Sequence, residues 1–367
     1  MGFKTALYAT HQAMGGKLVD FGGWDMPLHY GSQLEEHHQV RNASGMFDVS
    51  HMTVVDVKGE EAKTYLQYLL ANDVAKIEAI AGKALYSGML NLEGGVIDDL
   101  IVYNMPQNVS APWFRVVVNC GTREKDLAWM NKVAANFKIE LTERTDLAMV
   151  AIQGPKAIEL TKTAVSSARA AVINSLTIFQ GLPEGDWFIA RTGYTGEDGL
   201  EIMLPNTEVV AFWQALNAAG VPACGLAARD TLRLEAGMNL YGHEMDDGVS
   251  PLAANMGWTI ALTPTDRNFI GRNVIEAQKN AGPAFKLVGL VLRERGVMRA
   301  EQLVSVDGSE QKGVVTSGTF SPTLGYSIAL ARVPANIGRQ CYVDMRGKQV
   351  LVHVVARNFV RNGKPLV

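Results

Sequence analysis

The sequence predicts a multi-domain α+β fold that ends in a smaller all-β domain. With 367 residues, the chain is longer than a single hydrophobic core organises, so two or three domains are expected. Strand-like and helix-like patterns mix over most of the chain, whereas the last part contains strand-like runs alone. Together these observations favour mixed helix and sheet units first and a small β domain last.

Three segments show a strand pattern followed by a helix pattern. They are residues 53–70, 114–136 and 149–165, in which alternating or continuous apolar residues give way to helical spacing. Thr122 is a plausible N-cap for the second helix, and Pro155 suits the first turn of the third. These segments supply the strand-to-helix units of the α+β region.

Residues 186–205, DWFIARTGYTGEDGLEIMLP, differ because they predict two strands joined by a glycine-rich loop. A further helix is expected from about Asn206 onward. Hairpins mixed with helices favour an α+β sheet over a doubly wound parallel one, which requires a helix between successive strands.

The C-terminal part, from Lys286 onward, has no helix pattern. Its strand-like runs are KLVGLVL, GVVTSG, YSIALARV, CYVDM and VLVHVVA, with turn signals at Asp307-Gly308, Pro322 and Gly338. Regular short strands with such turns predict a separate barrel or sandwich of about 80 residues. The polar stretch 279–284, KNAGPA, is the expected boundary.

Composition excludes several function classes. A net charge of −3, without a dense cluster of Lys and Arg, argues against a nucleic-acid partner. No apolar run approaches the ~18 residues of a membrane span, and the start of the chain lacks a secretory apolar core. The three scattered cysteines form no metal-binding spacing and suit a reducing compartment, so we expect a cytoplasmic protein without a metal.

Three apparent motifs fail on inspection. GYTGEDG (193–199) lacks the GxGxxG spacing and lies between two strands, so a dinucleotide site is not expected. GMNLYGH (237–243) has His where a phosphate loop needs Lys, and the adjacent His37 and His38 point in different directions on a helix. Covalent, metal and nucleotide chemistry are therefore not indicated.

The stretch GGVIDDLIVY (94–103) places two acids inside an apolar run that predicts a buried strand. Burying an ionised carboxylate without a partner is costly. Neighbouring residues of a strand face opposite sides, so Asp98 and Asp99 do not form a dyad. Either both acids are structural at the end of a strand, or one faces a cleft while the other serves the structure. The pattern alone does not say which acid would face the cleft.

Six blocks of sequence, in order along the chain, resemble one known family, the glycine cleavage system T-protein. They are FGGWDMPLHY (21–30), GMFDVSHM (45–52), GGVIDDLIVY (94–103), TGYTGEDGLEI (192–202), GLAARDTLRLEAGMNLYG (225–242) and TSGTFSPTLGYSIALARV (316–333). The resemblance implies a cloverleaf of three domains around a central cavity. Two intertwined, ferredoxin-like α+β parts, 1–50 with 140–283 and 51–139, bind folate, and a β-barrel spans 284–367.

The same resemblance implies an activity, a co-substrate and partners. Family members are aminomethyltransferases that move a methylene from the aminomethyl group on the lipoyl arm of the H-protein to tetrahydrofolate. Ammonia leaves, and methylenetetrahydrofolate and dihydrolipoyl H-protein are formed. The implied partner is the lipoylated H-protein, with functional association to the P- and L-proteins and no metal.

For the catalytic residue, the resemblance implies Asp99, whose family counterpart faces the folate amines. The assignment has a physical basis, since a carboxylate in a low-dielectric cleft stabilises an iminium-like carbon. It can also accept a proton as the ring closes. Asp98 then faces away and is expected to have a structural role.

The resemblance also implies a set of folate-binding residues. Glu201 matches the carboxylate that accepts from the amino group and ring N–H of the pterin, a donor pair suited to two parallel hydrogen bonds. Without the resemblance, Glu201 is a surface acid and Arg229 a charge on a helix surface. The full implied set is Met52, Tyr86, Val117, Asn119, Tyr194, Glu201, Arg229 and Trp258, with Arg299 near the entry of the lipoyl arm.

Alternatives remain at this point. One is a demethylase of the same fold that transfers a methyl group to tetrahydrofolate, for which Asp99 and Glu201 would also serve. Another is a non-catalytic folate-binding relative linked to iron–sulfur protein maturation, but this chain lacks the Cys of that signature at 193–197. A scaffold that binds folate or H-protein without turnover is the last.

Overall fold

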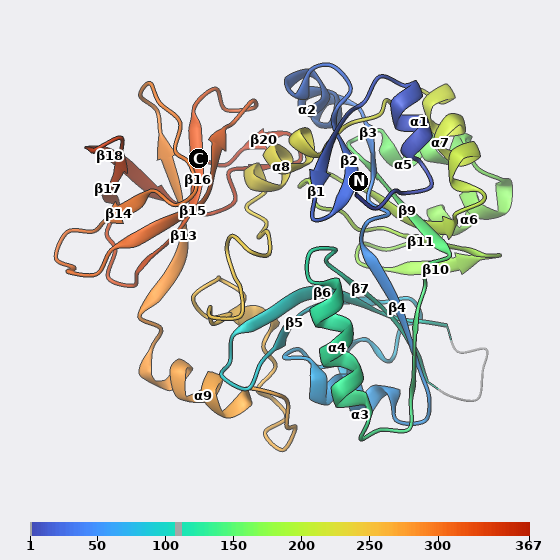
Figure 1. Ribbon diagram of the computed structural model, residues 1–367, viewed down its shortest axis with the longest axis horizontal. Helices are drawn as coiled ribbons and strands as arrows, with labels where there is room; N and C mark the ends of the chain where they lie inside the picture. Colours follow the sequence, from blue (N-terminus) through green and yellow to red (C-terminus); the bar gives the residue numbers. More distant parts are fainter. Residues whose placement is uncertain (1, 107–111) are drawn as a thin grey trace.

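The computed structural model describes residues 2–106 and 112–367 and confirms a mixed helix and sheet fold with a C-terminal barrel (Figure 1). Two five-stranded sheets and one closed six-stranded barrel account for most of the strands. Every strand pair within the two sheets is antiparallel, in agreement with the predicted α+β fold.

The first sheet carries the two acids of the central strand pattern. In spatial order its strands are β5 (Ala84–Leu90), β6 (Val96–Asn104), β7 (Trp113–Val118), β4 (Thr53–Lys58) and β8 (Glu140–Glu143). Helices α3 (Ala62–Leu69) and α4 (Arg123–Ala134) cover one face, where Leu66 and Met130 join Leu100 and Val102 in one hydrophobic core. The short helix η1 (Val74–Ile77) completes that core.

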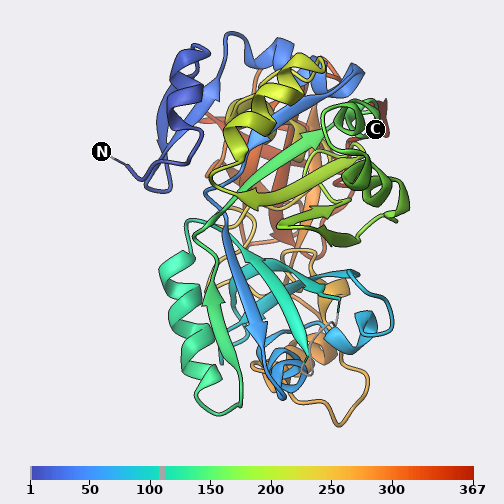
Figure 2. The same ribbon diagram turned by 90° about the vertical axis from the view of Figure 1, so that its right-hand side faces the viewer.

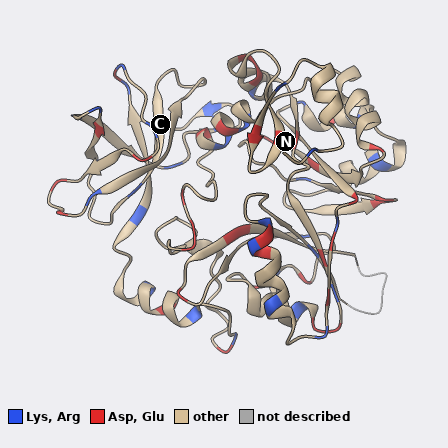
Figure 3. Cartoon of the chain, viewed as in Figure 1, with Lys and Arg blue, Asp and Glu red and all other residues tan. Residues whose placement is uncertain are grey.

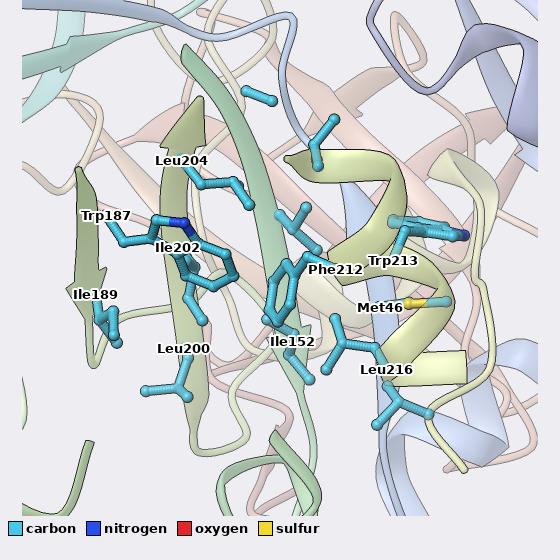
Figure 4. Close-up of a cluster of buried hydrophobic side chains, with 14 of the residues drawn as sticks. Met46, Ile152, Trp187, Ile189, Leu200, Ile202, Leu204, Phe212, Trp213 and Leu216 are labelled. Carbon is cyan, nitrogen blue, oxygen red and sulfur yellow. The ribbon is translucent and has the colours of Figure 1, made fainter. Parts of the chain in front are cut away.

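The second sheet lies above the first in the view of Figure 2. Its strands, in spatial order, are β10 (Gly181–Glu184), β11 (Trp187–Ala190), β12 (Gly199–Pro205), β9 (Leu147–Gln153) and β3 (Gly45–Asp48). Helices α5 (Ala157–Thr163), α6 (Ser167–Ser175) and α7 (Val209–Ala218) pack on it. Figure 4 shows Phe212, Trp213 and Leu216 of α7 among the side chains of the strands.

The two sheets meet through a third core. Val54, Tyr103 and Val117 of the first sheet pack there with Phe47 and Met203 of the second. One face of β6 therefore points toward the helices α3 and α4, and the other points toward the second sheet. This arrangement decides the surroundings of the two neighbouring acids.

The chain crosses between the sheets twice. Strand β3 belongs to the second sheet, β4 to β8 form the first, and β9 returns to the second. Because β8 still pairs with β4 of the first sheet, the chain returns to the second sheet only after Glu143, the last residue of β8. The domain boundaries expected from the sequence stay a prediction.

The barrel forms because its strands pair in a closed ring. In order around the ring these are β13 (Phe285–Leu292), β16 (Ser327–Pro334), β15 (Gly313–Phe320), β14 (Leu303–Ser305), β17 (Gln340–Met345) and β18 (Lys348–Val355). The five runs identified in the sequence are five of these strands. The sixth, β14, is only three residues long and has no sequence signal of its own.

The remaining elements connect these parts. They are α1 (Tyr8–Ala13), β1 (Lys17–Phe21), β2 (Trp24–His29), α2 (Gln33–Asn42), α8 (Leu226–Glu235), η2 (Gly257–Thr259), α9 (Arg272–Ala281), β19 (Val360–Arg361) and β20 (Lys364–Pro365). Helices α2 and α8 pack against each other, and α8 also contacts the barrel strands β15 and β16.

Three local expectations need correction. Thr122 occupies the N-cap of α4, but its hydroxyl donates to the carbonyl of Asn119 instead of capping the helix. Pro155 lies in the turn before α5, which begins at Ala157. The helix expected from about Asn206 begins at Val209, after a turn.

Charged residues are spread over the sheets, the helices and the barrel, with both signs interspersed (Figure 3). None of the helices in the described ranges has the length and apolar character that crossing a membrane requires.

Candidate functional site

The two acids of β6 have different surroundings. Asp98 points to the face covered by α3 and α4 and is 0% exposed. Asp99 is half-buried and points, with Ile101, to the side of the second sheet. Of the two, Asp99 is the one that a bound molecule could reach.

Two neutral donors hold the Asp99 carboxylate. The Tyr86 hydroxyl of β5 donates to Oδ2 at 2.7 Å, and the Asn119 Nδ2 donates to Oδ1 at 2.9 Å. Both donors arrive through strand pairing, because β5 and β7 flank β6 and Asn119 directly follows β7. The carboxylate is thus oriented by two neighbouring strands of its own sheet.

Burial and the nearby charge of Asp98 raise the pKa of Asp99 to about 7, although hydrogen bonds from Tyr86 and Asn119 oppose the shift. No Lys, Arg or His of the described residues forms an ion pair with Asp99. A carboxyl with this pKa exchanges its proton close to neutral pH, as a general acid or base requires.

A second group lies on the second sheet and α8. Glu201 of β12 is 7% exposed, and its Oε2 accepts a hydrogen bond from the Thr192 hydroxyl at 2.7 Å. Its Oε1 lies 4.0 Å from Nη2 of Arg229 and accepts no hydrogen bond from the described residues. Glu201 therefore presents one free carboxylate oxygen beside a cation.

Arg229 is nearly buried but incompletely paired. Its guanidinium lies 4.9 Å from the centre of the Tyr194 ring, and its Nη1 has no hydrogen-bond partner among the described residues. Burial lowers the pKa of Arg229, with the charge of Glu201 opposing the shift. Because an unsatisfied buried donor is costly, this nitrogen is available to a ligand.

Tyr194 links the two groups. Its hydroxyl donates to the carbonyl of Asn239, and its ring faces Arg229. Burial raises the pKa of Tyr194, and the charge of Asp99 contributes to the same shift. Tyr194 thus lies within electrostatic reach of both Asp99 and Arg229.

The other expected site residues divide into near and distant ones. Trp258 is 62% exposed and stacks on Tyr86, with ring centres 5.6 Å apart. Val117 and Met52 lie in or against the core between the sheets. Arg299 is exposed on the barrel, and no hydrogen bond or ion pair joins its side chain to another described residue.

Three residues near the site are not among those predicted from the sequence. Thr192 supports Glu201, and Asp126 of α4 faces Asp98. Arg357, which follows the last barrel strand β18, lies within electrostatic reach of Tyr86. The helical pattern of 123–134 could not single out Asp126, because acids in the first turn of a helix are common.

Comparison with known proteins identifies the family. The family model described as the GCVT N-terminal domain matches residues 7–264, and the glycine cleavage T-protein C-terminal barrel domain matches residues 286–361. The chain belongs to the glycine cleavage T-protein family. An aminomethyltransferase of Chromobacterium violaceum is 59% identical over 361 residues, which cover 98% of each chain.

A solved T-protein structure agrees in fold. The crystal structure of glycine cleavage system aminomethyltransferase T from Bartonella henselae gives a TM-score of 0.90 at 33% identity, over 99% of both chains. The predicted family and activity are confirmed: the chain is an enzyme, with the aminomethyltransferase function of the glycine cleavage T-protein. The demethylase and the non-catalytic alternatives are not favoured.

Within residues 2–106 and 112–367, no three or more His, Cys, Asp and Glu side chains are grouped so as to hold a metal ion.

Proposed function

We propose that Asp99 is the catalytic carboxylate of aminomethyl transfer from the lipoyl arm of the H-protein to tetrahydrofolate. In this reaction the carbon leaves a sulfur and a nitrogen of the carrier and joins two folate nitrogens. The two protons that the folate nitrogens lose end on ammonia and on the dihydrolipoyl thiol. Asp99 accepts a proton from the folate amine and stabilises the positive charge on the carbon during transfer.

The observation that carries this proposal is the environment of Asp99. It is a half-buried carboxylate with a pKa of about 7, held by Tyr86 and Asn119 and paired with no cation of the described residues. An Arg or Lys beside it would cancel the charge that a cationic carbon needs. Neutral donors orient the carboxylate and leave its charge available.

Glu201 and Arg229 fit the pterin end of tetrahydrofolate. The free Oε1 of Glu201, together with Oε2, suits the adjacent amino group and ring N–H of a pterin. The unpartnered Nη1 of Arg229 can donate to an acceptor of the same ring. Tyr194 lies between this pair and Asp99, and it completes one wall of the proposed pocket.

The remaining implied residues are proposed to contact the rest of the folate and the lipoyl arm. Trp258, stacked on Tyr86, offers an aromatic face at the rim to the rest of the folate. Met52 and Val117 supply apolar lining, and Arg299 on the barrel remains the proposed contact for the lipoyl arm. The lipoylated H-protein is the proposed partner, with functional association to the P- and L-proteins.

The test is tetrahydrofolate-dependent release of ammonia from aminomethylated H-protein. Asp99→Asn should lose roughly 10²–10⁴-fold in turnover, the span typical of a general base. Asp186→Asn, at an exposed acid, is the matched control and should keep the wild-type rate. The proposal is wrong if Asp99→Asn, folded as judged by circular dichroism, keeps a near-wild-type rate.

A further inference from the structure

Strand β6 contributes to a second pair of acids, on the face of the sheet that the helices cover. Asp98 of β6 and Asp126 of α4 are both 0% exposed, and their carboxyl groups lie close enough for each to shift the pKa of the other. They meet because α4 covers the face of the sheet to which Asp98 points. The pair belongs neither to the proposed pocket nor to the hydrophobic core around it.

The pair has few donors. Neither oxygen of Asp126 receives a hydrogen bond from an N–H or O–H of the described residues. The Thr122 hydroxyl lies close enough to Asp126 to lower its pKa, but its single proton goes to the carbonyl of Asn119 at 3.1 Å. No Lys, Arg or His of the described chain forms an ion pair with Asp98 or Asp126. Two ionised carboxylates in contact without a cation repel strongly in a buried site, so the pair needs a proton.

Asn119 connects this pair to Asp99. Its Nδ2 lies 2.8 Å from Oδ1 of Asp98 and 2.9 Å from Oδ1 of Asp99, and its backbone N–H donates to Oδ2 of Asp98 at 2.9 Å. The amide group is therefore positioned by Asp98 on one side and positions Asp99 on the other. A displacement of Asp98 would be transmitted to the Asp99 carboxylate through one side chain.

We propose that Asp98 and Asp126 share one proton, and that this acid pair positions Asp99 by fixing the side chain of Asn119. Asp126 is then a positioning residue and not a catalytic one. The role assigned to Asp99 above is required only for the effect on catalysis, since the shared proton is a property of the pair itself.

The titratable groups around the pair are consistent with one retained proton. Burial raises the pKa of Asp126 to about 6, and burial together with the charge of Asp126 raises the pKa of Asp98 well above its usual value. The groups that face the pair are Asp99 on β6, Tyr86 on β5, Cys120 after β7, Lys125 on α4 and Tyr241 before η2.

Lys125 is the one cation among these neighbours, but it is engaged elsewhere. Its Nζ donates to the Tyr241 hydroxyl at 2.7 Å and to Asp247 at 2.8 Å. It lowers the pKa of Asp126 without forming an ion pair with it. With no cation of the described residues paired with the two carboxyl groups, a proton retained between Asp98 and Asp126 would serve as their hydrogen-bond donor.

Asp126→Asn and Asp126→Ala separate this proposal from simple core packing. The Asn amide replaces the shared proton with a permanent donor, so turnover at pH 7 should stay within about threefold of wild type. At higher pH, wild type should lose activity as the pair ionises, while Asp126→Asn should not. Asp126→Ala should lose about tenfold or more in kcat. Equal impairment of both variants, or identical pH profiles for wild type and Asp126→Asn, overturns the proposal.

Two measurements do not depend on catalysis. Infrared spectra at pH 8 should contain the band of a buried protonated carboxyl in wild type and in Asp99→Asn, and lack it in Asp126→Asn. The thermal midpoint of Asp126→Asn should rise relative to wild type between pH 4 and 8, because only wild type must retain a proton that the unfolded chain releases. If the band persists in Asp126→Asn, no proton is shared. If the band behaves as expected but Asp99→Asn is active, the shared proton is supported and the catalytic role proposed for Asp99 is wrong.

Discussion

Two clusters of buried carboxylates in this molecule have opposite electrostatic surroundings. Glu235, at the junction of α2, α8 and the barrel, is 0% exposed and paired with Arg41 at 2.9 Å and His37 at 3.2 Å. Ser321 and Thr323 of the barrel also donate to it. Although burial opposes the shift, these partners lower the pKa of Glu235 to about 2.

Asp99, on β6, has only the neutral donors Tyr86 and Asn119 and a neighbouring acid, and its pKa is raised to about 7. Carboxylates with cations stay ionised at every physiological pH and hold elements together. Carboxylates without cations keep a proton that can be exchanged. Within one fold, the presence or absence of a cation thus separates an acid that stays ionised from one that exchanges its proton near neutral pH.

The largest effect on stability should follow removal of the charge of Glu235. Glu235→Gln removes one of the two carboxylates that pair with the buried Arg41, since Glu197 remains at 2.7 Å, and it weakens the contact with His37. Losing a buried, hydrogen-bonded charge in this way costs about 1.5–3 kcal/mol. Urea denaturation at pH 7 measures the loss. The difference from wild type should shrink as pH falls from 5 to 2, because the stabilisation by a lowered pKa disappears on protonation. A difference independent of pH would contradict the structural role of this charge.

The pH dependence of the wild-type enzyme should differ in sign from that of its stability. The role proposed for Asp99 requires its ionised form, so kcat/KM for folate-dependent transfer should rise with an apparent pKa of about 7. Below that pH the rate should fall about tenfold per unit. The raised pKa makes the opposite contribution to stability, which declines as pH rises from about 4 to 7. If kcat/KM did not change between pH 6 and 8, the expected difference in titration between Asp99 and Glu235 would not be supported.

Tyr86→Phe should sharpen the comparison by removing one neutral donor from Asp99. A hydrogen bond to a charged group contributes about 1.5–3 kcal/mol, so the apparent pKa of kcat/KM should move upward by about one unit or more. Tyr342→Phe on the barrel, where no side-chain hydrogen bond is formed within the described residues, is the control and should leave the profile unchanged. An unshifted profile in Tyr86→Phe would mean that this hydroxyl does not tune Asp99.

Trp258→Ala should have the smallest effect. The indole is 62% exposed and stacks on Tyr86, so it adds an aromatic contact at the rim without touching the Asp99 carboxylate. Loss of about 0.5–1.5 kcal/mol should raise the KM for tetrahydrofolate several-fold and leave kcat nearly unchanged. A fall in kcat with unchanged KM would place Trp258 in the reaction instead of in binding.

Local pattern alone determined much of the fold. The apolar run around Asp98 and Asp99 specified a strand, and its alternation placed the two acids on opposite faces. The short runs after Lys286 specified five strands of a separate β domain, with barrel and sandwich both left open. These features depend on the period of a strand or helix, which a few consecutive residues encode. Strand β14 could not be predicted in this way, because three residues are too few to show a period.

Only the tertiary structure decided which acid lies under the helices and what each acid contacts. Asp126 is distant from Asp98 in sequence, and Thr192 and Arg229 reach Glu201 from a loop and from a helix. The protonation of each carboxyl depends on burial and on the charges around it, and both are created only when separate elements pack. The sequence therefore specified where the acids stand along the chain, and packing of the sheets and helices determined their chemistry.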